Sequence, residues 1–161
     1  VAEKTAEVLE DEGHEVFFFD PQEREVPPLG SRTYVDEGES PEDIQELSQE
    51  VQESDGVIIV TPEYNHSIPG VLKTALDYLY PEYDEKPFSF ITVSGGVFGG
   101  VRVLNHIHDI VLELGGFVGP DMQVSRVGEV FSENGELLDK NYNKRFSDFV
   151  KDTVDFVERM R

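Results

Sequence analysis

The order of apolar and polar positions along the chain predicts alternating strands and helices. Four short runs are apolar on both faces, as a parallel strand needs when helices cover both sides of its sheet. These expected strands cover residues 15–20, 56–60, 86–94 and 117–125. Elsewhere apolar residues recur at helical spacing, and the expected helices cover residues 1–12, 40–51, 69–80, 103–114 and 146–160. This alternation predicts right-handed crossovers and one doubly wound parallel α/β domain over residues 1–161.

A long connection separates the first expected strand from the second expected helix. Residues 21–40 are rich in proline, glycine and charge, which is typical of a surface segment. Its length fits either a cover over a site or a subunit neighbour, or an inert connection. Ser40 and Pro41 predict the helix start, with Ser40 as N-cap and Pro41 at the first helical position.

The loop after the strand at residues 56–60 is the first candidate for a binding site. Ligands of open parallel sheets bind outside the carboxyl ends of the strands, and Thr61–Ser67 follows such an end. Prolines stiffen the loop, Asn65 tolerates unusual backbone angles, and Tyr64 offers a ring that can stack on a planar ligand. An ordinary strand-to-helix turn explains the same spacing equally well, so this loop alone does not establish a site.

A glycine-rich loop follows the next expected strand. Ser94–Gly100 has the sequence SGGVFGG, with four glycines in seven residues. Glycines at this place permit close approach of the backbone to an anion or a ring. One such loop is a weak signal, but two loops at the same edge of a sheet predict a ligand site with more force.

Composition limits the partners and the surroundings of this protein. With 34 acidic against 13 basic residues the net charge is −21, which argues against nucleic acid as a partner because phosphate binding needs a basic surface. The acids are spread along a chain with 38% hydrophobic residues, so neither disorder nor an acidic tail explains them. We expect a surface adapted to high salt, as in halophilic archaea. The lack of cysteine, signal peptide and membrane span predicts a soluble cytoplasmic protein.

Other chemistry-bearing residues give weaker hypotheses. His106 and His108 do not share a helix face, so we expect solvent or interface histidines and no metal site. Arg102 follows the glycine loop and could meet an anionic substrate, a cofactor phosphate or a subunit carboxylate, although a plain ion pair is the simplest expectation. Lys73 and Asp77 are spaced for an ion pair on one helix. No Ser/His/Asp set is visible, and no catalytic side chain is predicted.

The two loops together carry a family resemblance. Thr61–Leu79, with PEYNHSIPGVLKTALDYL, and Ser94–Arg102, with SGGVFGGVR, resemble the flavin-binding loops of the NADPH-dependent FMN reductase family. That family has a flavodoxin-like fold and includes quinone, azo-dye and chromate reductases. The resemblance covers essentially the whole chain. It implies a flavodoxin-like sheet that holds FMN, takes hydride from NADPH or NADH, and reduces a flavin, a quinone or a similar small acceptor.

The resemblance also implies which residues border the flavin. The expected contacts on the isoalloxazine come from Thr61, Pro62, Glu63, Tyr64 and Asn65, largely through backbone groups and the Asn65 amide. The expected contacts on its pyrimidine side come from Ser94, Gly95, Gly96 and Gly99. Surplus tyrosines at residues 78–80, together with the family resemblance, predict a homodimer, or a homotetramer. Two alternatives stay open: a flavodoxin-like electron carrier without enzyme activity, and an interaction domain that has lost its flavin.

One part of the family pattern has no counterpart in the sequence. Members of the family begin with a strand and a G-S-x-R-x-x-S loop that cradles the FMN phosphate at the first helix. This chain opens on that helix at Val1. Because the first strand lies at the centre of a 2-1-3-4-5 sheet, its loss would leave two strands unpaired. We therefore expect a truncated form of a longer protein, with the phosphate-binding residues upstream of Val1.

Overall fold

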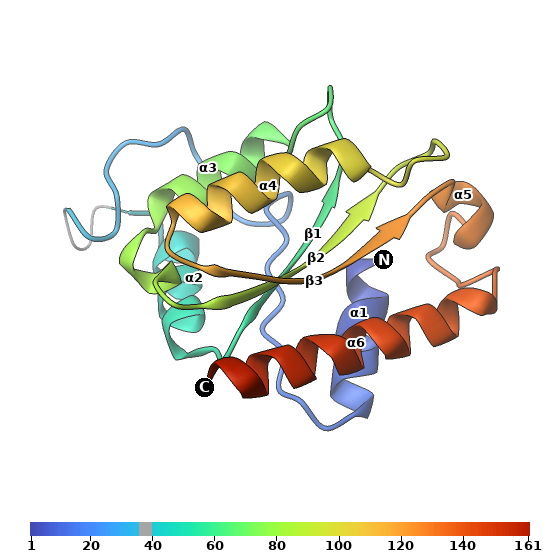
Figure 1. The fold of residues 1–161 in the computed structure, drawn as a ribbon. Helices are drawn as coiled ribbons and strands as arrows, with labels where there is room; N and C mark the ends of the chain where they lie inside the picture. The colour runs from blue at the N-terminus through green and yellow to red at the C-terminus, as the bar shows by residue number, and fades with distance from the viewer. Residues whose placement is uncertain (36–39) are drawn as a thin grey trace.

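The protein has three layers, with a parallel sheet between two layers of helices. The computed structural model describes residues 1–35 and 40–161. Its three-stranded sheet has the order β1-β2-β3, with β1 at Val57–Pro62, β2 at Pro87–Val93 and β3 at Phe117–Val124. Figure 1 shows α3 and α4 on the upper side of this sheet and α1 and α6 on its lower side. From β1 onward, the alternation of strands and helices expected from the sequence is confirmed.

Each face of the sheet has its own hydrophobic core. Helices α2 (Glu42–Glu53), α3 (Gly70–Tyr78) and α4 (Val101–Glu113) cover one face. Helices α1 (Ala2–Asp11) and α6 (Asn141–Met160) cover the other. The first core includes Ile59, Phe88 and Phe90, and the second includes Ile91 and Val124, so alternate strand residues point to opposite sides. The two cores bury β2 nearly completely and hold the strand ends in fixed positions.

Strand register decides which loop residues become neighbours. Pro62 at the end of β1 pairs with Val93 at the end of β2, and Val93 pairs with Val124 at the end of β3. The carboxyl ends of all three strands therefore lie at one edge of the sheet. A short helix, α5 (Val127–Val130), follows β3, and a bridge between Phe131 and Leu137 closes the turn after it.

The prediction of a strand at residues 15–20 is wrong for this structure. Residues 14–20 form no strand, and β1 pairs only with β2 within the described residues. In a 2-1-3-4-5 sheet, residues 15–20 would be strand 2 and β1 would be strand 3, and strand 1 would lie between them. No described segment forms hydrogen bonds in that place. Within the described residues, β2 alone has a neighbouring strand on each side.

The start of α2 also differs from its prediction. Pro41 occupies the N-cap position in an extended conformation, with ψ 151°, so Ser40 lies one residue too early to cap the first turn. The Ser40 hydroxyl is buried and has no hydrogen-bond partner among the described residues. The carboxylate of Asp43 accepts a hydrogen bond from the Glu25 amide and one from Arg24 instead.

The connection before α2 packs on the end of α3. The Tyr78 hydroxyl donates hydrogen bonds to the carbonyls of Pro27 and Pro28, and the Thr33 amide donates to the Tyr78 carbonyl. Tyr78, which makes these contacts, and Leu79 are both buried, whereas Tyr80 stays 45% exposed. Of the two tyrosines at residues 78–80, Tyr78 therefore belongs to the core of this chain, which weakens the argument for a dimer face, and Tyr80 remains exposed. Residues 36–39 of the connection, including Gly38, lie outside the described residues.

Candidate functional site

The turn after β1 is a tight two-residue hairpin with an unusual backbone. Tyr64 and Ser67 exchange two backbone hydrogen bonds of 2.9 Å, and Asn65 and His66 between them have φ values of 51° and 66°. Two successive left-handed residues form a type I′ turn, which asparagine tolerates better than most residues. This geometry presents Tyr64, Asn65 and His66 to solvent, and Tyr64 is 57% exposed.

The glycine loop after β2 is folded back on the strand that precedes it. The Thr92 hydroxyl donates a 2.7 Å hydrogen bond to the Gly99 carbonyl. Gly99 and Gly100 have φ values of 60° and 82°, and a Cβ on them would lie 2.7 Å from Gln123 and 2.9 Å from Thr92. Both positions therefore require glycine. Gly95 and Gly96 differ, because a Cβ on either would meet no neighbouring residue closely.

The two loops are joined to each other through α4. The Glu63 carboxylate accepts hydrogen bonds from the backbone amides of Arg102 and Val103, at 3.2 and 3.4 Å. The Glu63 amide donates to the Val93 carbonyl at 3.2 Å, next to the start of the glycine loop. One turn further along α4, His106 Nδ1 lies 3.1 Å from the Ser67 hydroxyl. The structure thus brings together the two loops that the sequence singled out separately.

The end of β3 supports the glycine loop from the other side. The Arg126 amide donates to the Gly96 carbonyl at 2.9 Å, and the Val127 amide donates to the Ser94 carbonyl at 3.1 Å. Arg126 itself adopts a left-handed conformation, with φ 48°. The sequence does not single out this third segment, because nothing in residues 125–127 distinguishes them from an ordinary strand end.

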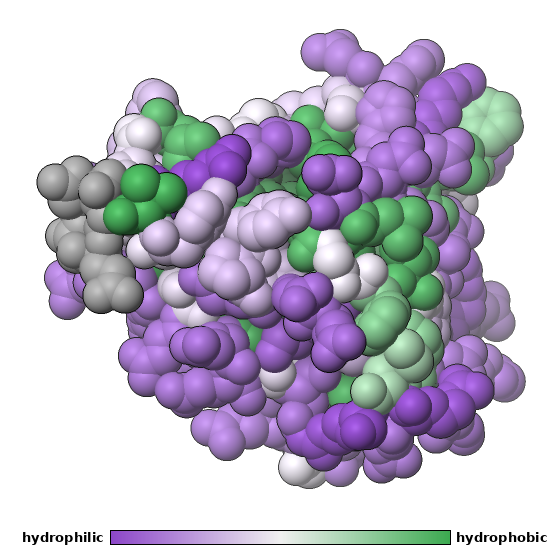
Figure 2. Space-filling view, turned by 60° about the vertical axis from the view of Figure 1, so that its left-hand side comes forward, coloured by the Kyte–Doolittle hydropathy of each residue, from purple (hydrophilic) through white to green (hydrophobic). Residues whose placement is uncertain are grey.

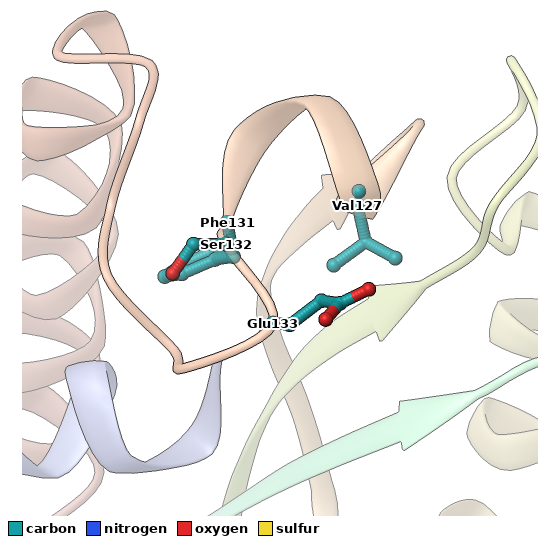
Figure 3. A pocket seen from close by; sticks show the side chains of 5 residues that line it. Val127, Phe131, Ser132 and Glu133 are labelled. Carbon is teal, nitrogen blue, oxygen red and sulfur yellow. The ribbon is translucent and has the colours of Figure 1, made fainter.

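An open hollow of about 470 Å³ lies beside this third segment. Its walls come from Val127, Gly128, Phe131, Ser132 and Glu133, all in α5 or the turn after it. Figure 3 shows the Glu133 side chain pointing toward that of Val127 across the hollow. The hollow adjoins the glycine loop through the Val127 to Ser94 bond but includes none of the predicted flavin contacts.

The predicted site residues divide into exposed and buried ones. The side chain of Thr61 is buried, and its hydroxyl donates to the Pro62 carbonyl, so it faces the interior. Gly99 is also buried and acts through the shape of the loop. The remaining seven are accessible or half-buried at the sheet edge: Pro62, Glu63, Tyr64, Asn65, Ser94, Gly95 and Gly96. Thr92 and Gly100 were missed as supports of the site, although a threonine ending an apolar strand just before glycines is a usable signal.

Several backbone amides at this edge have no acceptor among the residues that the structure describes. Among the described residues, the amides of Asn65, Gly95 and Gly96 donate no hydrogen bond, and all three residues are exposed. Exposed apolar side chains stand next to them, with Val97 57% and Phe98 64% exposed. Free amide donors beside an apolar surface suit a flat ring with a polar edge better than a small ion. The ring's edge can accept the hydrogen bonds while its face packs on the apolar side chains.

The remaining candidate residues contact neighbouring side chains of the same chain. Arg102 forms no ion pair within the described chain and instead lies 5.5 Å over the Phe98 ring, so the simple expectation for it was wrong. The Lys73 and Asp77 ion pair is confirmed at 2.5 Å. His108 packs against Phe90, with ring centroids 4.7 Å apart, and burial lowers its pKa. Its side chain is therefore half-buried against the core and is not the free solvent histidine that was one of the two expectations.

The described residues contain neither a metal-binding cluster nor a membrane-spanning helix. No group of three or more histidines and carboxylates in residues 1–35 and 40–161 lies close enough to hold a metal ion. Nor does any helix in those ranges combine the length and the hydrophobicity needed to cross a membrane.

Comparisons with known proteins agree on one family. The model of the NADPH-dependent FMN reductase family matches residues 1–129. The quinone reductase of Escherichia coli K12 is 30% identical over 148 residues, covering 88% of this chain and 78% of the relative. A 2-hydroxy-1,4-benzoquinone reductase of Burkholderia sp. is 30% identical over 130 residues, covering 76% and 70%.

The overall fold also has a close counterpart among solved structures. FerB from Paracoccus denitrificans, a flavoenzyme NAD(P)H:(acceptor) oxidoreductase, superposes with a TM-score of 0.77 over 99% of this chain and 91% of its own. The sequences are 24% identical, so the likeness concerns the fold. Together with the parallel β1-β2-β3 sheet it confirms the flavodoxin-like α/β class expected from the sequence.

Proposed function

The chain belongs to the NADPH-dependent FMN reductase family, and we propose that it reduces a quinone with electrons from NAD(P)H. It is an FMN-dependent oxidoreductase by family. FMN supplies the chemistry when bound, because its ring accepts a hydride and passes on two electrons. The net reaction converts NAD(P)H, a proton and a quinone into NAD(P)⁺ and a hydroquinone. The names of the two quinone-reducing relatives support the quinone as acceptor.

The observation that carries the proposed site is the joined pair of loops at the carboxyl ends of β1 and β2. The free amides of Asn65, Gly95 and Gly96 would donate to the polar edge of the flavin ring, with Pro62 and Tyr64 beside it. Ser94 donates to the Gly96 carbonyl at 3.2 Å and holds the glycine turn open. These groups fit a flavin ring, since they combine donors with a surface free of side chains at Gly95.

The chain's own residues would also set the acceptor class. Tyr64, Val97 and Phe98 are exposed next to the free amides, and their faces suit a flat aromatic acceptor. Arg102 lies over Phe98 and keeps a cation at this edge, where it would attract the oxygens of a quinone. A flat acceptor with two carbonyl oxygens uses both features, which supports a quinone over a small inorganic anion.

We further propose a single FMN-binding domain over residues 1–161 that works as a homodimer in the cytoplasm. Exposed apolar side chains at Val71, Phe98 and Val101 support the dimer, because they leave apolar area near the proposed site. The use of NAD(P)H as reductant supports the cytoplasm as the location, because NAD(P)H is available there. Sedimentation at several protein concentrations tests the dimer, and a monomer at all of them would contradict it.

Anaerobic reduction tests the proposed function. We expect the protein loaded with FMN to lose its visible flavin absorbance within seconds of adding NADPH, and to recover it on adding a benzoquinone. Steady-state rates should give parallel double-reciprocal lines, since both substrates react in turn at one site. Intersecting lines would contradict that order. A protein that binds FMN but is not reduced by NADPH or NADH would instead be an electron carrier.

A pair of glycine variants tests the site itself. Gly95→Val places a side chain where the flavin edge would lie, and its Cβ meets no chain atom within 4 Å, so the fold should survive. We expect at least a tenfold weaker affinity for FMN, or roughly 1.4 kcal/mol. Gly30→Val is the matched control, because its Cβ is equally free but lies in the connection before α2. Equal FMN affinity of the two variants would show that the flavin does not bind beside Gly95.

A further inference from the structure

The geometry points to Glu63 as a positioning residue that clamps the two flavin loops together and places a negative charge beside the flavin ring. The inference rests on the proposed function, since it concerns the same site. It is argued from the Glu63 carboxylate, which accepts hydrogen bonds from the second and third amides of α4, at 3.2 Å from Arg102 and 3.4 Å from Val103. These contacts join residues 39 and 40 positions apart in the chain.

Helix α4 depends on Glu63 because it has no cap of its own. Its N-cap residue is Gly100, which has a left-handed backbone, no side chain and so no capping hydrogen bond. The first amides of a helix need an acceptor from elsewhere. The loop after β1, residues 61–67, supplies that acceptor through Glu63. The glycine loop therefore ends on a helix whose first turn is held by the other loop.

The clamp has further contacts that fix its direction. The Glu63 amide donates to the Val93 carbonyl, so the residue is held by its backbone as well as by its carboxylate. The Ser67 hydroxyl and His106 Nδ1, 3.1 Å apart, repeat the connection one turn along α4. Movement of either loop would break these bonds, and we infer that the clamp keeps both walls of the flavin site at a fixed separation.

The charge of Glu63 faces the start of α4, and no ion pair with a cation balances it in the described part of the chain. Within the described residues Glu63 forms no ion pair, and the nearby Arg102 guanidinium lies over Phe98 instead. The positive end of the α4 dipole faces the carboxylate. Without Glu63 this positive end would stabilise the negative charge that a flavin ring gains on two-electron reduction. Glu63 offsets it and keeps the bound flavin a stronger reductant.

Two substitutions separate the clamp from the charge. Glu63→Gln keeps an oxygen that can accept from the Arg102 amide but removes the charge, whereas Glu63→Ala removes both. Glu113→Gln is the matched control, because it removes one charge from an exposed residue at the opposite end of the same helix. All three variants are made in the full chain.

Hydrogen exchange of the flavin-free protein tests the clamp. We expect the Arg102 and Val103 amides to exchange roughly tenfold faster in Glu63→Ala and less than that in Glu63→Gln, while Glu113→Gln leaves them unchanged. Unchanged exchange in Glu63→Ala would overturn the clamp. This measurement needs no FMN, so it decides on Glu63 even if the chain fails to bind flavin.

The midpoint potential of bound FMN tests the charge. We expect Glu63→Gln to favour the reduced flavin roughly tenfold, a rise of about 30 mV for a two-electron couple, with Glu113→Gln at the wild-type value. A potential that stays the same or falls in Glu63→Gln would overturn the role of the charge. A wild-type chain that takes up no FMN would overturn the proposed function and the charge step together, and leave the exchange result standing.

Discussion

The Thr92 hydroxyl is hydrogen-bonded to the Gly99 carbonyl at 2.7 Å, across the base of the glycine loop. Thr92 is fully buried in β2, and Gly99 is buried above it. The bond therefore ties the end of the loop to the strand from which it starts. Gly99 and Gly100 both have positive φ, which glycine adopts without strain, so the sharp return of the loop onto β2 depends on glycine at these two positions.

Replacement of Thr92 by valine should loosen the glycine loop. Valine keeps the shape but removes the donor, so the Gly99 carbonyl is left buried without a partner. We expect the free energy of unfolding to fall by ~1–3 kcal/mol and FMN to bind more weakly. Urea unfolding and an FMN titration measure the two effects. Thr92→Ser keeps the hydroxyl and serves as the control; an equal loss in both variants would show that the methyl group matters instead.

Two glycines of the same loop should respond differently to alanine. Gly99→Ala forces a Cβ within 2.7 Å of Gln123 at a φ of 60°, so something must move. Gly95→Ala meets nothing within 4 Å. We expect thermal unfolding to reveal a loss of ~2 kcal/mol or more for Gly99→Ala, and less than ~0.5 kcal/mol for Gly95→Ala. Similar melting temperatures for the two variants would contradict the strained geometry at Gly99.

How much of this site the sequence predicts depends on the range of each contact. The apolar run of β2 and the glycines after it identify the second loop, because both signals lie in adjacent residues. The Glu63 to Arg102 contact joins residues 39 positions apart, and it exists only because Pro62 pairs with Val93 in the sheet. No pattern in one sequence encodes that register. The link between the two loops could therefore be expected in general but not assigned to a residue.

Other differences come from neighbours that the local pattern does not reveal. Residues 15–20 have the composition of a buried strand, yet a strand needs a hydrogen-bonded neighbour, and none of the described segments provides one. Tyr78 looked like interface surface because its helix already had an apolar stripe. Its burial depends on Pro27 and Pro28, in a connection whose path the sequence does not determine.

His108 should make the stability of the protein depend on pH. Burial lowers its pKa in the folded chain, and the carboxylates of Asp121 and Asp109 oppose that shift without cancelling it. The unfolded chain, with an ordinary pKa of 6.5, then takes up the proton first. Stability is therefore present above about pH 6.5 and is lost as the pH falls toward the lower folded pKa.

We expect the His108→Leu variant to lose part of this pH dependence. Leucine packs on Phe90 without a titrating group, so its free energy of unfolding should fall less than that of the wild type between pH 7 and about pH 5. Urea unfolding at several pH values measures the slope. His14→Leu is a control at an exposed histidine. Identical slopes for His108→Leu and the wild type would rule out His108 as the source.

The acidic surface should make the protein more stable in salt. Hydrophilic residues cover most of the face shown in Figure 2, and ion pairs occupy a minority of the carboxylates in the described chain. Raising the ionic strength shortens the screening length from about 30 Å at 0.01 M to about 3 Å at 1 M. We expect a clear rise in melting temperature over this range of potassium chloride. Sucrose, which stabilises without screening, is the control.

Helix α1 allows the same electrostatic effect to be tested with single residues. Its last turn has no basic residue and includes Glu10, which places a negative charge at the negative end of the helix dipole. Glu3 lies in the first turn, where a negative charge is favourable. We expect Glu10→Gln to raise the melting temperature at low salt by a few degrees, and Glu3→Gln to lower it, since each charge is worth ~0.3–1 kcal/mol. Both shifts should shrink in 1 M salt because screening removes them. Shifts of the same sign in the two variants would mean that net charge, and not position along the helix, decides the effect.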